Sequence, residues 1–396
     1  MTSAFTRLRS QHTSLQAACI AALTTLVTPV AFATNGTMPH GYGIKAMGMG
    51  GVSIALPQDA VAAANNPAGM AFIGERVDLG LSVVLPRPEA TLGGTNFDGS
   101  GVDAIAVPDF GYNRPLDKHQ TVGVSVYGNG VATKYSTSIA GGPGSDNDAA
   151  QLTQIIIAPT YAIQLAPGQA LGVSLDLAYQ RFKVDGVPDS LGRESRGTDT
   201  STGVGFKIGW TGQVTEQLTL GAVYVARIQM GKLSTYSRLL ANDGEFDIPE
   251  RYGIGAAWRP VPSVVLAADV MRVNWGKISS LANGITASEP GFGWQNQTIT
   301  RIGAAWDYSS ALTLRAGVSY GTRIINKSST FLNYLAPVTP QSHLSMGGTY
   351  KLDVDNEISF MTAHAYGKTV RGTGASSGMD VRMTQNWFGA SWSRSW

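Results

Sequence analysis

Large apolar residues alternate with small or polar ones along most of the chain, from about residue 76 to its end. In residues 170–179 every second position is apolar, and small or polar residues such as Ser174 and Asp176 stand between them. Residues 311–320 repeat the pattern. A period of two residues places alternate side chains on opposite faces of a β-strand. The pattern therefore predicts a series of strands, each with one apolar face.

The connections between these segments also follow a pattern, because short turns alternate with long polar loops. An even number of strands with tight turns at one end and long loops at the other is typical of bacterial outer-membrane barrels. A soluble β-sandwich also alternates, but it lacks this asymmetry. The predicted fold class is all-β, a transmembrane antiparallel β-barrel of about 14 strands over residues 76–396. We expect strands to begin near residues 76, 102, 119, 150, 170, 203, 217, 249, 263, 296, 311, 342, 355 and 381.

The composition supports a membrane protein that has no helical spans. Charged residues make up 14% of the chain, against ~25% in soluble domains. Glycine accounts for 48 of the 396 residues. No internal stretch reaches the ~18 apolar residues of a spanning helix. Together with the loop pattern, this predicts a location in the cell outer membrane of a Gram-negative bacterium.

Residues 1–33 have the features of a secretory signal peptide. Two arginines precede an apolar core, and the small-residue site 31–33 places cleavage before Thr34. Cleavage would remove Cys19, the only cysteine, so the mature chain is expected to contain no disulfide. The chain has 29 basic and 27 acidic residues, and the loss of the two arginines leaves 27 of each. No basic stripe remains, so nucleic acid is not an expected partner.

Residues 34–75 do not alternate and are rich in glycine and methionine. Their lysines and carboxylates are few, namely Lys45, Asp59 and Glu75, so this segment is expected to be buried. The lumen of a 14-stranded barrel is wide enough to need a filling. Residues 34–75 are therefore predicted to form an N-terminal hatch, or plug, with a short helix over residues 58–64.

The hatch segment resembles a known family. The run 58–71, which contains Asn66, Pro67 and Ala68, is similar to the hatch signature of the FadL-type long-chain fatty acid transporters. That family includes the TodX-like hydrocarbon channels. Residues 312–320 are similar to a late strand of the same family.

A second match covers residues 127–135, which resemble the third strand of the family. In that strand an Asn/Gly kink breaks the pairing and opens the wall sideways. The resemblance assigns this role to Gly128, Asn129 and Gly130. Glycine suits such a break because it permits bulges that end strand pairing.

The resemblance implies uptake of hydrophobic compounds, with long-chain fatty acids as the expected substrates. Binding in an apolar cavity would gain ~0.8 kcal/mol per buried CH₂, and lateral release would deliver the molecule into the bilayer. Neutral aromatic hydrocarbons are the alternative substrates. The family's capture groove is apolar, but residues 185–202 are polar here. Residues 232–247 or 324–340 are the alternative positions for capture.

The strand phase directs several basic residues into the lumen, because on the lipid face each would cost ~2–4 kcal/mol. We expect Arg315, with Arg301 or Lys207, to hold a carboxylate headgroup deep in the barrel. The competing interpretation is that each basic residue pairs with an inward carboxylate and holds the wall and the hatch together. The candidate carboxylates are Asp176, Asp269, Asp307 and Glu357.

Other classes of function receive less support from the sequence. There is no Gly-x-Ser-x-Gly elbow and no histidine pair with metal-ligand spacing, so we expect no enzyme activity, no cofactor and no metal. A general porin for small polar solutes would not need an apolar hatch. The terminal strand ends at Trp396 and resembles the signal read by the barrel assembly machinery. Outer-membrane lipid and lipopolysaccharide are the other expected partners of a monomer.

Overall fold

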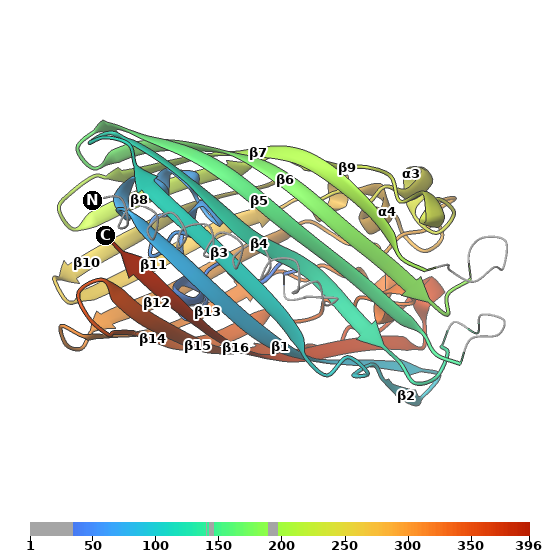
Figure 1. Cartoon of the computed structure of the whole chain (residues 1–396). Coiled ribbons are helices and arrows are strands. Elements are labelled where there is room, and N and C mark those ends of the chain that lie inside the picture. Colours follow the sequence, from blue (N-terminus) through green and yellow to red (C-terminus); the bar gives the residue numbers. More distant parts are fainter. Residues whose placement is uncertain (1–34, 140, 142–145, 189–196) are drawn as a thin grey trace, which may run out of the picture. The chain divides into compact units, whose positions relative to one another are not determined.

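The computed structural model describes residues 35–139, 141, 146–188 and 197–396. The predicted signal peptide and its cleavage site before Thr34 lie outside the described residues. Within the described part, one antiparallel sheet contains 16 strands, and its last strand pairs with its first. Two of these strands are short, and the other fourteen form the closed barrel shown in Figure 1. The predicted fold class is confirmed.

The strands are β1 (Arg76–Leu92), β2 (Thr95–Asp98), β3 (Ile105–Pro115), β4 (Gln120–Lys134), β5 (Ala149–Ala166), β6 (Gln169–Asp185), β7 (Asp199–Gln213), β8 (Leu218–Val225), β9 (Gln229–Met230), β10 (Arg251–Val261), β11 (Val264–Val273), β12 (Gln297–Asp307), β13 (Leu312–Gly321), β14 (Ser342–Lys351), β15 (Asn356–Tyr366) and β16 (Met379–Ser395). Among the fourteen long strands, the largest difference from a predicted start is four residues, at β7.

The helices are all short: α2 (Ile44–Met47), α3 (Ala241–Gly244) and α4 (Ser279–Ala282), with the 3₁₀ turns η1 (Ala62–Ala64), η2 (Pro67–Phe72), η3 (Ser234–Tyr236), η4 (Trp275–Lys277), η5 (Lys327–Ser329), η6 (Leu332–Tyr334) and η7 (Gly374–Ser376). None of the helices in the described residues has the length and apolar character that a membrane crossing requires.

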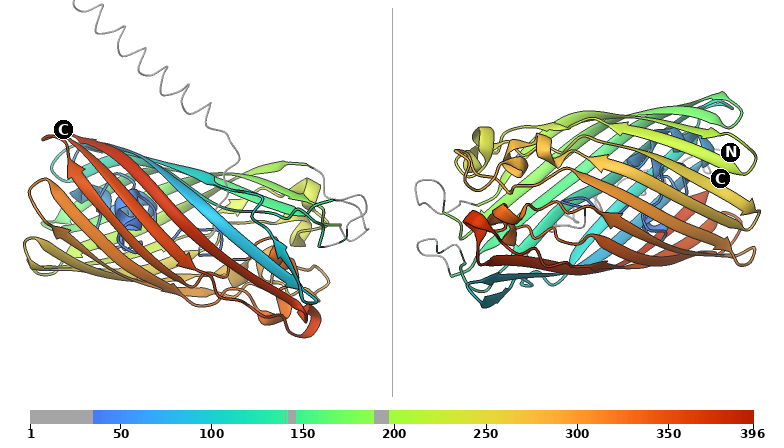
Figure 2. Two further views of the ribbon diagram at one scale, coloured as in Figure 1. Left: turned by 90° about the horizontal axis from the view of Figure 1, so that it is seen from below. Right: turned by 180° about the vertical axis from the view of Figure 1, so that it is seen from behind.

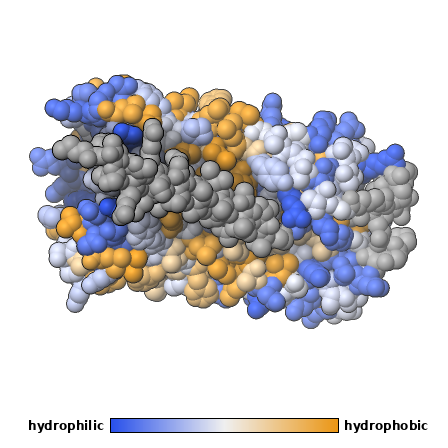
Figure 3. Space-filling view, viewed as in Figure 1, coloured by the Kyte–Doolittle hydropathy of each residue, from blue (hydrophilic) through white to orange (hydrophobic). Residues whose placement is uncertain are grey.

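The apolar face of the strands is the outer face of the barrel. In β6, Leu171, Val173, Leu175 and Leu177 are exposed, whereas the residues between them are buried. Figure 3 shows the result as an apolar band in the middle of the barrel, with hydrophilic residues toward both ends. A band of this kind on a closed barrel is the surface that lipid covers. The closed ladder also pairs the backbone groups that lipid could not satisfy.

The two ends of the barrel differ. Connections of two to four residues, such as 167–168 and 352–355, lie at one end, which also holds the start of β1 and the end of β16. We call this the turn end. At the opposite, loop end, residues 226–250, 274–296 and 322–341 form long connections that contain the short helices α3 and α4.

The hatch, residues 35–75, lies inside the barrel, where the views of Figure 2 show it as the blue segment. The predicted helix over residues 58–64 is wrong in extent and type, because the structure has only the 3₁₀ turn η1 there. An α-helix would direct the Ala63 carbonyl at residue 67, but Pro67 has no N–H. The Lys207 ammonium donates to the Ala63 carbonyl instead, at 2.8 Å.

Inward-facing glycines of the wall explain how the hatch backbone fits so closely. A Cβ on Gly172 would stand 2.3 Å from the carbonyl carbon of Pro67, and one on Gly317 equally close to the carbonyl carbon of Met49. Real Cβ atoms do not approach backbone this closely. The high glycine content therefore provides space for the hatch in the lumen.

Replacement of Gly317 by leucine should displace the hatch, since the new side chain would overlap Met49 and Gly50. We expect Gly317→Leu to lower the stability of the hatched barrel by ~1–3 kcal/mol and to open an ion-conducting path. Single-channel recording in planar bilayers measures the second effect. The matched control is Ala316→Leu, whose side chain faces outward on the same strand. Equal conductance of the two variants would contradict this account of the glycines.

Candidate functional site

The predicted hatch motif connects the hatch to the wall. The Asn66 side-chain oxygen accepts from the Ala68 N–H at 3.1 Å and so caps η2. The Asn66 amide nitrogen lies 2.7 Å from the Ile54 carbonyl and 3.1 Å from Thr211 Oγ1 on β7. Pro67 occupies the first turn of η2, where its missing N–H leaves no hydrogen bond unmade. The motif therefore fixes the hatch against β7.

Lys207, a predicted headgroup residue, is fully buried and joins three parts of the barrel. In addition to the Ala63 carbonyl, its ammonium donates to the Tyr127 hydroxyl of β4 at 3.1 Å. The ammonium is also 3.4 Å from Asp176 Oδ1, which makes an ion pair but not a well-aligned hydrogen bond. Asp176 is one of the four carboxylates that the competing interpretation named as partners for the inward basic residues.

Arg315, the second predicted headgroup residue, points into the lumen and contacts the hatch. Its Nε donates to Gln58 Oε1 at 2.8 Å, and its Nη1 donates to Thr349 Oγ1 at 2.7 Å. Nearby, Glu357 forms ion pairs with Lys45 of the hatch and with Arg76 of β1. These contacts hold the hatch at the turn end of the barrel.

Arg301, the third predicted residue, faces Asp269 across the β11–β12 pair. It lines a small cavity together with Arg251 and with Asn35, Tyr42 and other residues. Three nitrogens of its lining residues are buried and have no acceptor within the part of the chain that the structure describes. They are Nδ2 of Asn35, Nη2 of Arg251 and Nε of Arg301. Buried donors of this kind favour an acceptor with negative charge.

Arg251 was not among the predicted site residues, although the sequence contains a signal for it. Tyr252, Ile254 and Trp258 face outward on β10, so the phase of this strand directs Arg251 into the lumen. The position stands at the first residue of the strand, where the phase is hardest to assign from the sequence. Arg251 is only 4% exposed and lies over the Tyr42 ring, 5.9 Å from its centre.

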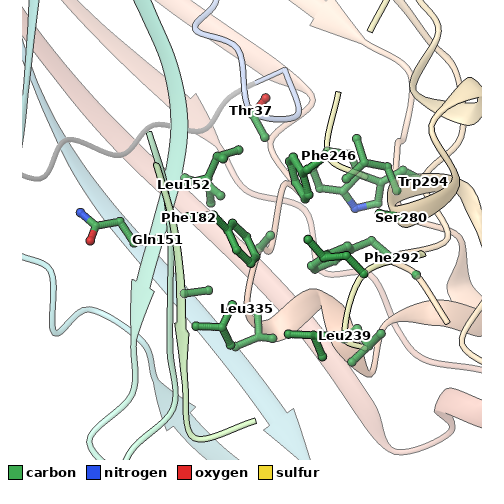
Figure 4. Close-up of a pocket in the computed structure, with 18 of the residues that line it drawn as sticks. Thr37, Gln151, Leu152, Phe182, Leu239, Phe246, Ser280, Phe292, Trp294 and Leu335 are labelled. Carbon is green, nitrogen blue, oxygen red and sulfur yellow. The ribbon is translucent and has the colours of Figure 1, made fainter. Parts of the chain in front are cut away.

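A larger apolar cavity lies toward the loop end; the space between its lining residues, part of which is open to solvent, is about 610 Å³. Figure 4 shows Phe182 and Leu335 directed into this space, while Gln151 points away from it. The lining joins both predicted capture segments, through Leu239 and Leu335, with a third loop that includes Trp294. The wall contributes Val131, Leu152, Phe182 and Val184, and the hatch contributes Thr37.

The barrel wall is interrupted beside this cavity. β3 and β4 pair only from Phe110–Val126 to the turn end, and in the described residues no pairing joins 105–109 to 127–133. A bridge between Ser100 and Lys134 closes the gap at the loop end. From Tyr127 to Thr133 the residues of β4 are buried without alternation, although the strand stays paired with β5 up to Lys134. The predicted kink residues Gly128, Asn129 and Gly130 lie in this stretch.

The N-terminal part of the hatch replaces the missing strand partner. The N–H of Gly130 donates to the Thr37 carbonyl at 2.7 Å. The Tyr42 hydroxyl donates to Asn129 Oδ1 at 2.6 Å. Two hatch residues therefore bind β4 where its pairing with β3 has ended.

The N-terminal part of the hatch also contributes one member of a stacked histidine pair. His40 of the hatch stacks on His343 of β14 with ring centres 5.5 Å apart. Burial lowers the pKa of the His40 imidazole to about 4, so this ring is neutral at pH 7. Three metal-ligating side chains do not gather anywhere in the described ranges.

Comparison with solved structures identifies similar barrels. The toluene transporter TodX of Pseudomonas putida has a TM-score of 0.70 at 20% identity, covering 90% of this chain and 99% of TodX. A FadL homologue of Pseudomonas aeruginosa has a TM-score of 0.69 at 15% identity, covering 91% and 99%. The Ralstonia pickettii toluene transporter TbuX has a TM-score of 0.66 at 15% identity, covering 90% and 99%. No curated protein sequence matches the chain.

A family model described as outer membrane protein transport protein (OMPP1/FadL/TodX) matches residues 20–392. This match covers nearly the whole chain, and the similar structures share its barrel. The protein therefore lies in the outer membrane and belongs to the OMPP1/FadL/TodX family of transport proteins.

Proposed function

We propose that the protein takes up hydrophobic compounds, with long-chain fatty acids as the main substrates, and releases them sideways into the bilayer. The observation that carries the proposal is the position of the apolar cavity. Val131 lines this cavity and also belongs to the part of β4 that has lost its pairing with β3. A molecule in the cavity is therefore beside the interruption in the wall.

The cavity suits capture from the cell exterior. Long loops of outer-membrane barrels face outward from the cell, and three such loops line the cavity. Transfer of ten CH₂ groups from water would gain about 8 kcal/mol. A porin without a binding site would offer no such gain.

The two buried arginines favour fatty acids over neutral compounds. We assign the first contact with a carboxylate to Arg301 and Arg251, because each has a buried nitrogen without an acceptor in the described chain. Lys207 and Arg315 also remain candidates, but a headgroup would have to displace Asp176 from Lys207, or Gln58 from Arg315. The ring of Tyr42, a hatch residue, lies close to Arg251, and its hydroxyl donates to Asn129 of β4.

Aromatic hydrocarbons are the second candidate substrates. Phe182, Phe246, Phe292 and Trp294 line the cavity, and aromatic side chains pack well against aromatic rings. Two of the similar structures, TodX and TbuX, are toluene transporters. Oleate and toluene are therefore the ligands to compare.

Substitution of Leu152 by aspartate should weaken ligand binding, because it places an unpaired carboxylate in the apolar cavity. We expect Leu152→Asp to lower the affinity for oleate and for toluene by at least about tenfold. Calorimetric titration of the purified barrel measures both affinities. Gln151→Asp is the matched control, since the neighbouring side chain points away from the cavity. Equal losses in the two variants would argue against this cavity as the binding site.

The carboxylate assignment predicts a difference between the two ligands. Arg251→Met and Arg301→Met should each lower oleate affinity by about 10- to 100-fold, the range for a charged hydrogen bond. Toluene affinity should stay within about twofold, since toluene has no charge to bind. The same titrations measure these values. If oleate and toluene lose affinity equally, the arginines support the fold rather than the headgroup.

Lateral release predicts that a bulky residue in the gap slows uptake without preventing binding. Val107 lies on the part of β3 that has no β4 partner, and its side chain is buried. We expect Val107→Trp to reduce uptake of labelled oleate by about tenfold in proteoliposomes, with unchanged affinity. Ala106→Trp, on the outward face of the same strand, is the control. Normal uptake by Val107→Trp would contradict lateral release.

A further inference from the structure

Four polar residues form a row across the inner face of the wall. Asn129 of β4 is the register partner of Gln154 on β5, Gln154 is the partner of Gln180 on β6, and Gln180 is the partner of Ser201 on β7. The three amides are at most 1% exposed. A side-chain amide has two kinds of hydrogen-bonding atom, and both need partners when they are buried.

Hydrogen bonds connect the row in a single direction. Asn129 Nδ2 donates to Gln154 Oε1 at 3.4 Å, Gln154 Nε2 donates to Gln180 Oε1 at 3.0 Å, and Gln180 Nε2 donates to Ser201 Oγ at 3.0 Å. Each amide donates with its nitrogen toward β7, and each glutamine accepts with its oxygen from the preceding amide, so the orientation of one amide determines that of the next. We call these four residues the amide row.

The first member of the amide row is the residue that binds the hatch at the opening. Asn129 Oδ1 accepts from the Tyr42 hydroxyl. If the Asn129 amide turned over, its NH₂ group would face Tyr42 in place of the oxygen, and the Tyr42 O–H would lose its acceptor. Gln154 opposes this rotation because its oxygen accepts from the Asn129 nitrogen. Gln154 therefore sets the orientation of Asn129, although the bond between them does not involve the hatch.

The last member of the amide row lies beside an element that leads to the apolar cavity. β7 pairs with β9 at Gly203–Met230, and the Gly231 N–H donates to the Thr202 carbonyl at 2.8 Å. The chain that follows β9 contains Leu239, Leu240 and Phe246, which line the cavity. The amide row therefore runs from the wall opening to the base of a loop that binds substrate in our proposal.

We propose that Gln154 and Gln180 are positioning residues that orient Asn129 so that it retains Tyr42 and keeps the hatch against the opening. This inference rests on the proposed lateral release. Loss of either glutamine frees the Asn129 amide to turn, and the N-terminal part of the hatch then leaves β4 more often. A purely structural role would stabilise the wall without changing how often the hatch leaves.

A thiol reporter on the hatch tests the proposal. Met38 is buried between the two hatch residues that bind β4. With Cys19→Ser and Met38→Cys, the reporter is the only thiol of the chain. In this background Gln154→Met should raise the rate of modification by a water-soluble thiol reagent about five- to tenfold, as expected for the loss of one hydrogen bond. Gln385→Met is the control, because Gln385 is equally buried and bonds only within β16.

A second pair of variants separates positioning from general destabilisation. Gln180→Glu keeps an acceptor for Gln154 Nε2 and should leave the modification rate near that of the parent. Gln180→Met removes the acceptor and should raise the rate like Gln154→Met. Heat-modifiable migration in gels confirms that each variant is a folded barrel. Equal rates for Gln154→Met and Gln385→Met, or for Gln180→Glu and Gln180→Met, would overturn the proposal.

The thiol measurement needs no substrate, so its outcome is independent of the transport assay. A raised rate in Gln154→Met together with normal uptake by Val107→Trp would reject lateral release and retain the role of the amide row. An unchanged rate together with blocked uptake by Val107→Trp would reject the role of the amide row and retain lateral release.

Discussion

The polypeptide inside the lumen has to make hydrogen bonds with the wall, because a buried backbone group without a partner is costly. The hatch has only one helical turn of α type, so most of its N–H and C=O groups cannot bond to each other. Wall side chains supply many of the partners. Asp78 accepts from the Ala60 N–H, Asp269 accepts from the Ser53 N–H, and Lys207 donates to the Ala63 carbonyl. A main role of the inward polar residues of the barrel is therefore to form hydrogen bonds with the hatch backbone.

The same constraint governs the break in the β3–β4 pairing. β4 gives up its pairing with β3 after Val126 but remains within a buried environment. Its backbone therefore needs other partners, and the Thr37 carbonyl of the hatch and the Gly99 carbonyl of the β2–β3 connection accept from it. The break in the β3–β4 pairing and the position of residues 35–42 therefore depend on the same hydrogen bonds.

Alternation predicted the strands well because a barrel wall has only two environments, lipid and lumen. Successive residues face these two environments in turn; Leu314 faces the lipid and Arg315 faces the lumen. The interior was harder to predict. The Ala63 carbonyl, which Pro67 leaves without a helical partner, accepts from a lysine 144 positions away. The lining of the apolar cavity comes from three loops that have no periodic pattern. Arg251 was not predicted as a site residue, because the first residue of a strand gives too little of the alternating pattern to show whether it faces the lumen or the lipid.

The contacts of the hatch are unevenly distributed, and this decides which part of it can move. Near the turn end, Lys45 and Arg315 tie it to the wall through an ion pair and a charge-assisted hydrogen bond, and Asn66 bonds to both Ile54 and β7. In the described structure, the hydrogen bonds between residues 35–42 and β4 are neutral: the Gly130 N–H donates to the Thr37 carbonyl, and the Tyr42 hydroxyl donates to Asn129. Neutral hydrogen bonds contribute ~0.5–1.5 kcal/mol each, and charged ones about twice as much. If ligands leave sideways as we propose, these weaker bonds to β4 favour release of residues 35–42 before the rest of the hatch, while the turn end stays closed.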